Sequence, residues 1–456
     1  MNGVTAVLDI GKTNVKVATF ARDGALVWER SMPNRVVLDT LYPHADVETI
    51  WAFLLAALAD ANKVERIAAI VPTTHGCAAA LIDVSGLVLP VMDYEFAGVA
   101  AIEPFYAPLR PPFAQSFSPP LPVGLNLARQ LAWQQRHFPE AFVRARYLLT
   151  YPQYWAWRLS GIAAAEVTSL GAHSDLWAPL QGQFSSVVAA LDLRRLMPPL
   201  RPAYQCLASI RPEVSTAAGL GHDVGVFCGV HDSNASLLQH LGSRRAPFTI
   251  VSTGTWVILM APGLSVTGLD PADDTLANVD VEGRPVATAR FMGGREYAAI
   301  AGAPGNPDPA ALTRVIASGA MALPCFAGPG AGGPFAARHG EIRGDIAAAD
   351  RPALATLYVA LMSDLMLTRL GVIAGDLIVE GSFAANPVYA ALLAALRPSQ
   401  PVFAGSDAAG TARGAALLAQ WPPRDFQPPP LIAARPCAVE GLHAYRDAWT
   451  RAVLEG

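Results

Sequence analysis

The stretch VLDIGKTNVKVATF, residues 7–20, contains an apolar run that ends at Asp9, a turn with Gly11, and a second apolar run. Apolar runs of this length on either side of a glycine turn predict two paired strands. The whole chain has only three lysines, and two of them, Lys12 and Lys16, belong to this stretch. A turn that combines positive charge, a glycine and one carboxylate is the first candidate for a functional site.

The composition restricts the class of protein. The chain has 456 residues, of which 52% are hydrophobic and 15% charged, so we expect a globular protein with two domains. A net charge of −4 without a basic block predicts neither a nucleic acid nor a membrane surface as partner. The apolar run 50–59 is too short to span a membrane, and no export signal is visible. Five scattered cysteines without a CxxC pair predict reduced thiols, no zinc site and a cytoplasmic protein.

The order of the predicted elements suggests two related halves. The first half opens with three short strands, a helix over 47–62 capped by Asp46, and a buried strand. The second half has two strands around Gly254, a long helix over 351–371, and further strand–helix pairs. The proline-rich segment after residue 421 is expected to be peripheral. Because DIGKT and STGTW occupy similar places in the two halves, we predict two related α/β domains.

Both polar turns have residues that suit a phosphate. In the first, Gly11 allows close backbone approach, while Thr13 and Asn14 supply donors. Asp9 beside a phosphate would need a bridging cation, and Mg²⁺ is typical. The second turn, STGTW at 252–256, repeats hydroxyl residues around a glycine. The alternative for either turn is an ordinary hairpin with a polar tip, and neither GxxxxGK[ST] nor GxGxxG occurs in the chain.

Three further polar positions follow predicted strands. Asp232 lies where a strand ends and a helix begins, so it is either a helix N-cap or a base for a substrate hydroxyl. His75, in TTHG at 73–76, either binds substrate or satisfies a hydrogen bond in the core. The segment MDYE at 92–95 either binds sugar hydroxyls or forms a solvated loop.

Taken together and in this order, these segments resemble the FGGY family of carbohydrate kinases. The resemblance rests on six motifs: LDIGKTNVK, TTHG with LPVMDYE, GVHDSNAS, STGTW, LIVEGSFAANPVY and ARGAALLA. It implies a two-domain α/β fold of the actin/hexokinase/Hsp70-like ATPase type, with ribonuclease H-like domains and a central cleft. The implied divisions are an N-terminal FGGY-type domain over 1–240, a C-terminal one over 241–424, and a peripheral tail over 425–456.

The resemblance also implies an activity, namely ATP-dependent transfer of the γ-phosphate to a hydroxyl of a small ketose or deoxyketose. The motif forms are nearest those of rhamnulose and fuculose kinases, so L-rhamnulose and L-fuculose are the leading substrates. ATP and Mg²⁺ would be required, and a homodimer is left open. Two rivals of the same fold remain: a nucleotide-driven regulator or chaperone, and a degenerate kinase that binds without turnover.

By the same resemblance, Asp232 would be the general base and, with Asp9, would hold Mg²⁺. The residues expected to bind the phosphates are Gly11, Lys12, Thr13, Asn14, Lys16, Ser252, Thr253, Gly254 and Thr255. The residues expected around the adenosine are Gly381, Ser382, Phe383 and Asn386. The residues expected to hold the sugar are His75, Gly76, Asp93, Tyr94, Glu95 and Asp232.

Three departures from the family pattern leave details open. Phe383 stands where the adenosine motif usually has a small residue, which leaves the nucleotide preference open. Lys12 replaces the usual Thr or Ala, so either Lys12 or Lys16 could contact phosphate. The segment MDYE replaces W-x-D-x-R, so the sugar of xylulose or glycerol kinases does not carry over.

Overall fold

A computed structural model of the chain describes residues 3–38, 41–302, 307–328, 333–405, 410–424 and 426–455. The chain divides into two compact units. Unit 1 comprises Met1–Arg244, Ala277–Pro285 and Ala409–Pro428. Unit 2 comprises Arg245–Leu276, Val286–Ala408 and Pro429–Gly456. The domain limits expected from the sequence, at 240/241 and 424/425, stay a prediction.

The first large sheet contains the N-terminal hairpin. Its strand order is β11 (Cys206–Ser209), β12 (Gly225–Phe227), β6 (Ile67–Thr74), β1 (Val4–Ile10), β2 (Asn14–Phe20), β3 (Leu26–Pro33), with β13 (Val230–His231) also paired to β6. Strands β1, β2 and β3 are antiparallel, whereas β1, β12 and β13 all run parallel to β6. All eight residues of β6 are buried, as expected for a parallel strand that is covered on both faces.

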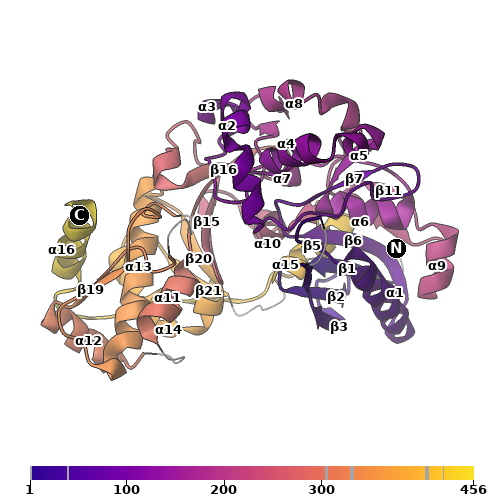
Figure 1. Ribbon diagram of the computed structural model, residues 1–456. Helices are drawn as coiled ribbons and strands as arrows, with labels where there is room; N and C mark the ends of the chain where they lie inside the picture. The colour runs from indigo at the N-terminus through magenta and orange to yellow at the C-terminus, as the bar shows by residue number, and fades with distance from the viewer. Residues whose placement is uncertain are drawn as a thin grey trace. The chain divides into compact units, whose positions relative to one another are not determined.

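Helices cover both faces of this sheet because successive strand residues point to opposite sides. Leu8 of β1 packs in one core with α1 (Val47–Val64), α6 (Tyr151–Ser160) and α9 (Pro212–Ala218). Val7 packs in a second core with α10 (Asp232–Leu241) and α15 (Gly410–Ala416). In Figure 1, α1 lies beside β1 and β2. Asp46 caps α1 as predicted, because its Oδ1 accepts a hydrogen bond from the Thr49 amide at 3.1 Å.

A helix-rich part of unit 1 follows residue 79. Its elements include β7 (Ala79–Ile82), α4 (Leu127–His137), α5 (Pro139–Arg144), β8 (Tyr147–Thr150), α7 (Val167–Leu170), β9 (Trp177–Ala178), β10 (Gln183–Phe184) and α8 (Ser186–Ala190). One expectation was wrong here, since the strand predicted before MDYE is reduced to isolated bridges, such as Ile82 with Leu87. Strand β8 pairs with β7 in an antiparallel manner.

The remaining elements of unit 1 before β8 are short. They are β4 (Val36–Val37), β5 (His44–Ala45), α2 (Glu103–Tyr106) and α3 (Phe113–Ser116). They connect the N-terminal hairpin, the segment at 92–95 and the helix-rich part of the unit.

The second large sheet repeats the arrangement of the first. Its strand order is β16 (Thr275–Val279), β17 (Pro285–Phe291), β15 (Val257–Pro262), β14 (Phe248–Thr253), β20 (Asp376–Gly381), β21 (Val402–Gly405), β22 (Leu431–Ala433). Strands β17, β15 and β14 are antiparallel, and β20 and β21 continue parallel to β14. This matches β3, β2, β1, β6 and β12 strand for strand, which bears out the prediction of two related halves.

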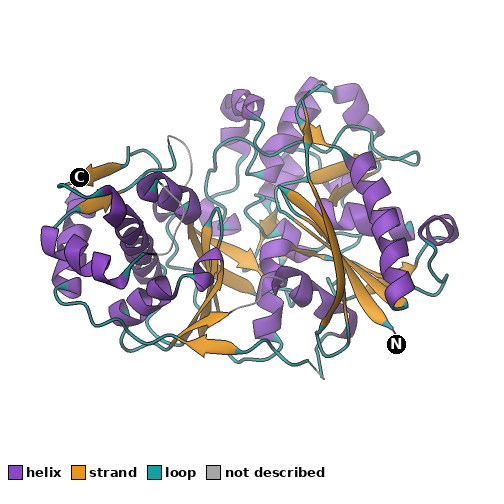
Figure 2. Cartoon of the chain, turned by 90° about the horizontal axis from the view of Figure 1, so that it is seen from below, coloured by secondary structure: helices purple, strands orange, loops and turns teal. Residues whose placement is uncertain are grey.

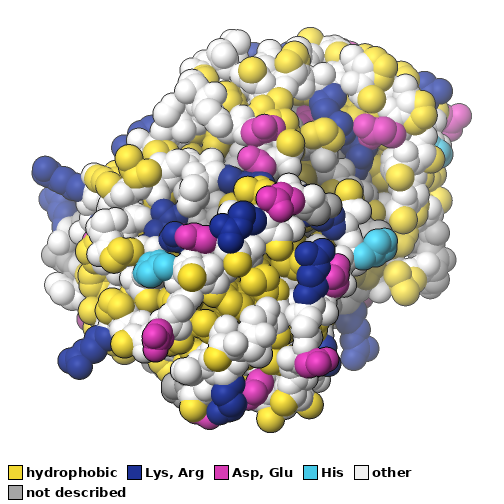
Figure 3. All heavy atoms as spheres, turned by 90° about the vertical axis from the view of Figure 1, so that its left-hand side faces the viewer, with side chains coloured by type: hydrophobic (Ala, Val, Ile, Leu, Met, Phe, Trp, Pro, Cys, Tyr) yellow, Lys and Arg dark blue, Asp and Glu magenta, His cyan; other side chains and the backbone are white. Residues whose placement is uncertain are grey.

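In unit 2, α13 (Arg351–Arg369) and α14 (Pro387–Leu396) contact this sheet, and Figure 2 shows helices beside strands in the left part of the chain. The helices α11 (Gly293–Ala301) and α12 (Pro309–Ser318) pack on α13, and α16 (Leu442–Glu455) packs on the short strand β18 (Met321–Leu323). A small hairpin pairs β18 (Met321–Leu323) with β19 (Glu341–Arg343). On the face drawn in Figure 3, basic and acidic side chains lie next to one another. Ion pairs of unit 2 include Arg314–Asp350 at 2.6 Å and Arg397–Asp364 at 2.5 Å.

The C-terminal segment is part of the unit 2 core, which differs from the expectation of a peripheral tail. β22 adds a strand to the sheet by pairing with β21. Trp449 of α16 is 1% exposed and its indole N–H donates to the Ala322 carbonyl at 2.7 Å. Proline-rich composition concealed this role, because one short strand and one helix carry the contacts. No helix within the described ranges combines the length and the apolar character that crossing a membrane requires.

Candidate functional site

Three parallel strands of unit 1 end side by side. In the register of the sheet, Asp9 of β1 lies opposite Thr73 of β6, and His231 of β13 lies opposite Thr74. The carboxyl ends of neighbouring parallel strands meet at one edge of a sheet, which is where α/β proteins commonly bind ligands. This register brings three separate sequence motifs to one place, with Asp232 following directly after β13.

Asp9 is a largely buried acid whose pKa is shifted by burial and by charged neighbours, as is common at functional sites. It lies directly opposite Lys16 in the β1–β2 hairpin, and the Lys16 Nζ is 3.9 Å from its Oδ2. Burial raises the pKa of Asp9 to about 6, Lys16 opposes this rise, and the negative charge of Asp232 adds to it. The two carboxylates therefore lie near enough to repel one another, and this part of the unit favours additional positive charge.

Asp232 is held by its neighbours through one oxygen. Its Oδ1 accepts hydrogen bonds from the Ser233 amide at 2.6 Å and the Ser233 hydroxyl at 3.3 Å. The His231 Nε2 is 3.2 Å from the same oxygen. The alternative that Asp232 is the N-cap of α10 was wrong, since the cap position is His231 and Asp232 is the first helical residue. No described residue donates to the other oxygen, Oδ2, which leaves it able to accept a proton.

The tautomer of His231 follows from its second contact. The Asn234 amide nitrogen lies 3.2 Å from His231 Nδ1, so Nδ1 accepts and Nε2 carries the hydrogen that it donates to Asp232. Burial lowers the pKa of His231, which keeps the ring neutral. Gly76 makes room for this ring, because a Cβ at Gly76 would lie 2.8 Å from His231 Nε2. The contact explains why a glycine follows His75.

His75 faces the same part of the unit. Its Nδ1 lies 2.8 Å from the Gly76 carbonyl oxygen, which can only accept, so Nδ1 carries the hydrogen and Nε2 is an acceptor. Its ring packs against Tyr94 and Tyr151, with centroids 5.5 and 5.3 Å apart. Burial lowers the pKa of His75, and the nearby charges of Asp232 and Asp93 oppose this. His75 is therefore a neutral acceptor close to both acids.

Lys12 contacts residues of the MDYE segment. Its Nζ lies 2.5 and 2.6 Å from the two carboxylate oxygens of Asp93, and 3.4 Å from Glu95. The same ammonium lies 4.8 Å from the centre of the Tyr94 ring. The Asp93 side chain is 6% exposed, whereas that of Glu95 is 60% exposed. The lysine that was expected among the phosphate ligands thus lies on the predicted sugar-binding residues.

The rest of the first turn is compact and open to a ligand. The Gly11 amide donates to the Asn14 carbonyl at 2.9 Å, which closes the turn. Asn34, which directly follows β3, fixes the turn, since its side-chain amide donates to the Gly11 carbonyl at 2.7 Å. Thr13 and Asn14 are exposed at the tip. The Asn14 side-chain amide donates to the Thr13 hydroxyl at 3.2 Å, and the role of both side chains as phosphate donors stays a prediction.

The second turn, in unit 2, is built on close backbone approaches. A Cβ at Gly381 would lie 1.9 Å from the Thr253 carbonyl oxygen, and a Cβ at Gly294 would lie 2.0 Å from that of Gly254. Gly254 itself has open space around its Cβ position. The buried Thr253 hydroxyl donates to the Glu380 carbonyl and accepts from the Phe383 amide at 2.9 Å. Thr253 is therefore a structural residue, while Ser252, Gly254 and Thr255 are more accessible.

Two of the residues expected around the adenosine lie in the core of unit 2. Phe383 is 7% exposed and its ring packs against Tyr297 and Tyr389 at 5.3 Å each. Asn386 is 5% exposed and caps α14 by accepting from the Val388 and Tyr389 amides. Gly381 and Ser382 are exposed. The sequence located this segment after β20, but the side chains of Phe383 and Asn386 stabilise the local fold.

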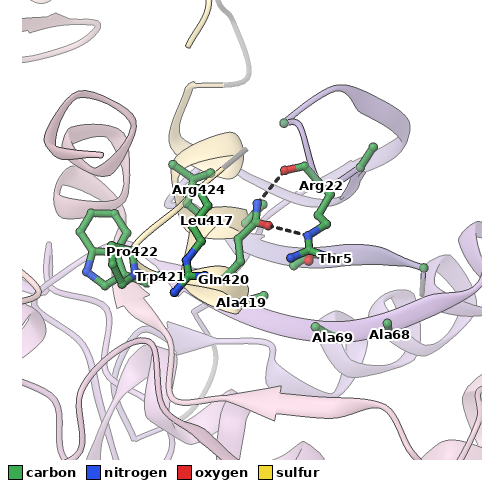
Figure 4. Close-up of a pocket in the computed structure, with 14 residues that line it drawn as sticks. Thr5, Arg22, Ala68, Ala69, Leu417, Ala419, Gln420, Trp421, Pro422 and Arg424 are labelled. Carbon is green, nitrogen blue, oxygen red and sulfur yellow. Dashed lines mark hydrogen bonds between the residues drawn. The ribbon is translucent and has the colours of Figure 1, made fainter. Parts of the chain in front are cut away.

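A hollow of about 350 Å³ in unit 1 lies away from the strand ends that carry Asp9 and His231. Figure 4 shows Arg22, hydrogen-bonded to Gln420, together with Trp421 and Arg424 on its wall. It is also lined by Thr5 and Ala69, which lie near the starts of β1 and β6. Asp9 lies four positions after Thr5 in β1, so the hollow opens roughly 13 Å along the strand from the strand ends that carry the motifs.

Sequence reasoning missed the residues that support Asp232. His231 precedes it in the quoted motif, and its amide donates to the Thr168 hydroxyl at 3.1 Å. That hydroxyl donates to the buried Glu166 carboxylate at 2.5 Å. Burial raises the pKa of Glu166 to about 7. The histidine next to the aspartate was a visible signal, but the link to residues 166–168 depends on tertiary packing.

Comparison with known protein families gives two matches. Residues 123–239 match the N-terminal domain of the FGGY family of carbohydrate kinases. Residues 245–428 match the C-terminal domain of the same carbohydrate kinases. The two matched segments follow one another in the order that the sequence predicted.

Similar proteins agree with this match. L-fuculokinase from Salmonella typhi is 27% identical over 270 residues, which cover 56% of this chain and 56% of that protein. The match thus spans little more than half the length of this curated relative. The crystal structure of a carbohydrate kinase from Novosphingobium aromaticivorans is 34% identical, with a TM-score of 0.90 over 100% of this chain and 99% of that one.

A xylulose kinase from Rhodospirillum rubrum has a TM-score of 0.80 at 18% identity, over 99% of both chains, and shows likeness of fold alone. These similarities confirm the two-domain ATPase fold of actin and hexokinase that the sequence predicted. Together with the strand order shared by the two sheets, they identify this chain as a member of the FGGY family of carbohydrate kinases.

Proposed function

We propose that the protein is an ATP-dependent kinase that phosphorylates a hydroxyl of a small ketose or deoxyketose, with L-fuculose and L-rhamnulose as leading substrates. The family match supports the reaction class. The likeness to L-fuculokinase and the motif GVHDSNAS support the choice of sugars. The observation that carries the proposal is Asp232, whose Oδ1 is held by Ser233 and His231 at one edge of the sheet.

Asp232 acts as the general base. The acceptor hydroxyl oxygen attacks the γ-phosphorus of ATP in line, and its proton passes to the Asp232 carboxylate. The new O–P bond forms as the bond from the γ-phosphorus to the β,γ-bridging oxygen breaks, and ADP leaves with that electron pair. His231 and Ser233 fix the carboxylate through Oδ1, so that Oδ2 can face the hydroxyl.

Asp9 and Asp232 fit a bound Mg²⁺. The raised pKa of Asp9 and its repulsion by Asp232 indicate that this place lacks positive charge. Among the described residues no three acidic, histidine or cysteine side chains gather into a metal cluster. Mg²⁺ commonly uses one or two carboxylates, waters and substrate phosphates, so the pair is sufficient. When bound, the ion would neutralise charge on the phosphates.

The two turns would bind the phosphates with different groups. We propose that Gly11 lets a phosphate approach the backbone closely, that Thr13 and Asn14 supply side-chain donors, and that Lys16 supplies a positive charge. Ser252 and Thr255 would supply hydroxyl donors, Gly254 would leave open space for the phosphate, and Gly381 and Ser382 would contact the nucleoside. Thr253, Phe383 and Asn386 would act indirectly, by shaping the backbone.

His75, Gly76, Asp93, Tyr94 and Glu95 would hold the sugar. His75 offers an acceptor nitrogen and Glu95 an exposed carboxylate, both of which suit neutral hydroxyls. Thr73 Oγ1 and Asn234 Oδ1 are buried without a hydrogen-bond partner among the described residues. Buried polar atoms without a hydrogen-bond partner are uncommon in protein cores, and they are consistent with a polar ligand nearby.

The proposed compartment is the cytoplasm. All five cysteines are free thiols, which suits a reducing environment. A homodimer stays a prediction that light scattering can test.

A panel of ketoses in an ADP-release assay with Mg²⁺ tests the activity. We expect ADP release only with a ketose or deoxyketose, with a phosphorylated sugar detected in equal amount. ADP release that is independent of sugar would favour the nucleotide-driven regulator. Nucleotide binding without turnover on any member of the panel would favour the degenerate kinase.

A further inference from the structure

The two lysines of the first turn have different partners. Lys16 lies in β2 and its Nζ is 3.9 Å from Asp9, a loose contact that leaves the ammonium able to reach other anions. Lys12 lies in the turn itself and its Nζ contacts both oxygens of Asp93 at 2.5 and 2.6 Å. A lysine ammonium has three N–H donors, and Asp93 engages two of them. The third faces Glu95 at 3.4 Å.

The Lys12–Asp93 pair is well shielded from solvent. The side chains are 23% and 6% exposed, and the Tyr94 ring lies 4.8 Å from the ammonium. A buried carboxylate is costly unless a cation compensates it. Asp93 also organises the MDYE segment, because its Oδ1 accepts from the Glu95 amide at 2.9 Å and its carbonyl accepts from the Phe96 amide at 3.0 Å.

We propose that Lys12 is a residue of acceptor specificity, which positions Asp93, Tyr94 and Glu95 for the sugar, and that Lys16 alone of the two lysines serves the phosphates. This inference rests on the proposed kinase function. For Lys12 to bind a phosphate, it would have to leave a shielded pair with Asp93. The positive charge of Lys12 also acts on His75, another residue of the proposed sugar site.

The proposal specifies the chemistry of the acceptor. Lys12 is neutralised by Asp93, and the carboxylate of Glu95 remains largely exposed. A neutral polyhydroxy compound can donate hydroxyl hydrogens to Glu95 and to the acceptor nitrogen of His75. A sugar acid would instead meet the charge of Glu95, so a neutral sugar is expected to be preferred over its acid.

The test replaces each lysine of the chain by methionine. We expect K12M to raise the KM for the sugar at least about tenfold, while the KM for ATP changes less than about threefold. K16M should give the reverse pattern. K63M is the matched control, because Lys63 is 75% exposed and pairs with Asp60 on the surface of α1. It should leave both constants unchanged. A K12M variant that loses ATP affinity but keeps its sugar KM would overturn the proposal.

Two additional measurements separate this inference from the proposed activity. The affinity for a non-hydrolysable ATP analogue is measured by calorimetry for all variants, which requires no turnover. If the wild type phosphorylates no sugar, the proposed function fails and the acceptor role of Lys12 fails with it, whereas unchanged analogue affinity in K12M beside a loss in K16M would still assign the phosphates to Lys16 alone. The double variant K12M/D93N removes both charges, so its thermal unfolding should be closer to wild type than that of K12M. An equal or larger loss would contradict the pairing.

Discussion

The β1–β2 turn and the β14–β15 turn occupy equivalent places in two sheets of the same strand order. The first turn has ionised neighbours, with Asp9 opposite Lys16 and Lys12 paired to Asp93. The second depends on glycines that let backbones approach closely, as at Gly381 beside Thr253, and its charged neighbour Arg290 lies 4.9 Å from the centre of the Trp256 ring. One topology thus supports two kinds of polar turn.

The difference shows which properties the sheet imposes and which the local sequence adds. The strand order places a turn at the same edge of each sheet, whatever its residues are. The charges in unit 1 gather because β1, β6 and β13 end together. In unit 2, the hydroxyl of Thr253 is used to fasten β14 to β20. We therefore expect substitutions in the first turn to change chemistry, and several in the second to change stability.

The largest effect should come from Asp232→Asn. Removal of the base should lower kcat by about 10³-fold, because the amide cannot accept the hydroxyl proton. ATP affinity, measured by calorimetry, should stay within about threefold of wild type. Retained turnover would show that Asp232 is not the general base. It would then be wrong to place the reacting acid beside the first turn and not the second.

A matched pair of glycine substitutions tests the second turn. Gly294→Ala places a methyl group 2.0 Å from the Gly254 carbonyl oxygen, so we expect a loss of about 3 kcal/mol in the free energy of unfolding. Gly254→Ala meets no atom within 4 Å and should change the free energy of unfolding by less than about 0.5 kcal/mol. If Gly254 approaches phosphate, that variant should still lower kcat/KM for ATP about tenfold. Unchanged kinetics would remove Gly254 from the site.

Threonine substitutions compare the two turns directly. Thr253→Val leaves the Phe383 amide and the Glu380 carbonyl without their partner. It should lower the free energy of unfolding, measured by chemical denaturation, by about 2 kcal/mol. Thr13→Val alters an exposed side chain and should have little effect on stability. Equal losses in both variants would mean that the hydroxyls play the same part in the two turns.

The smallest effect concerns pH. The pKa of Asp9 is about 6 in the folded protein and near 4 when unfolded, so the folded state binds an extra proton between these values. Asp9 therefore favours folding at low pH and loses that contribution as the pH rises through 6. Asp9→Asn should be more stable than wild type by about 1 kcal/mol at pH 8, and the difference should shrink below pH 5. A difference that grows on acidification would contradict the sign of the shift.

Much of this could be predicted from local patterns. The strands around Gly11 and Gly254, the cap at Asp46 and the start of a helix at Asp232 all follow from residues close in sequence. The C-terminal strand and helix were missed, because their contacts are made with distant parts of unit 2. Asn386 was expected beside the nucleoside, but it caps α14. An asparagine directly before Pro387 is a local signal that predicts this cap.

The positions of two glycine turns after strands, and of acids at strand ends, follow from residues close along the chain, since strand period and turn chemistry are local properties. The partners of the polar side chains follow instead from tertiary packing. Lys12 meets Asp93 across 81 residues, and Thr253 meets Glu380 across 127. Such pairs depend on which strands lie side by side. The topology of the sheet determines these neighbours, and the residues between the two partners carry no sequence signal of the pairing.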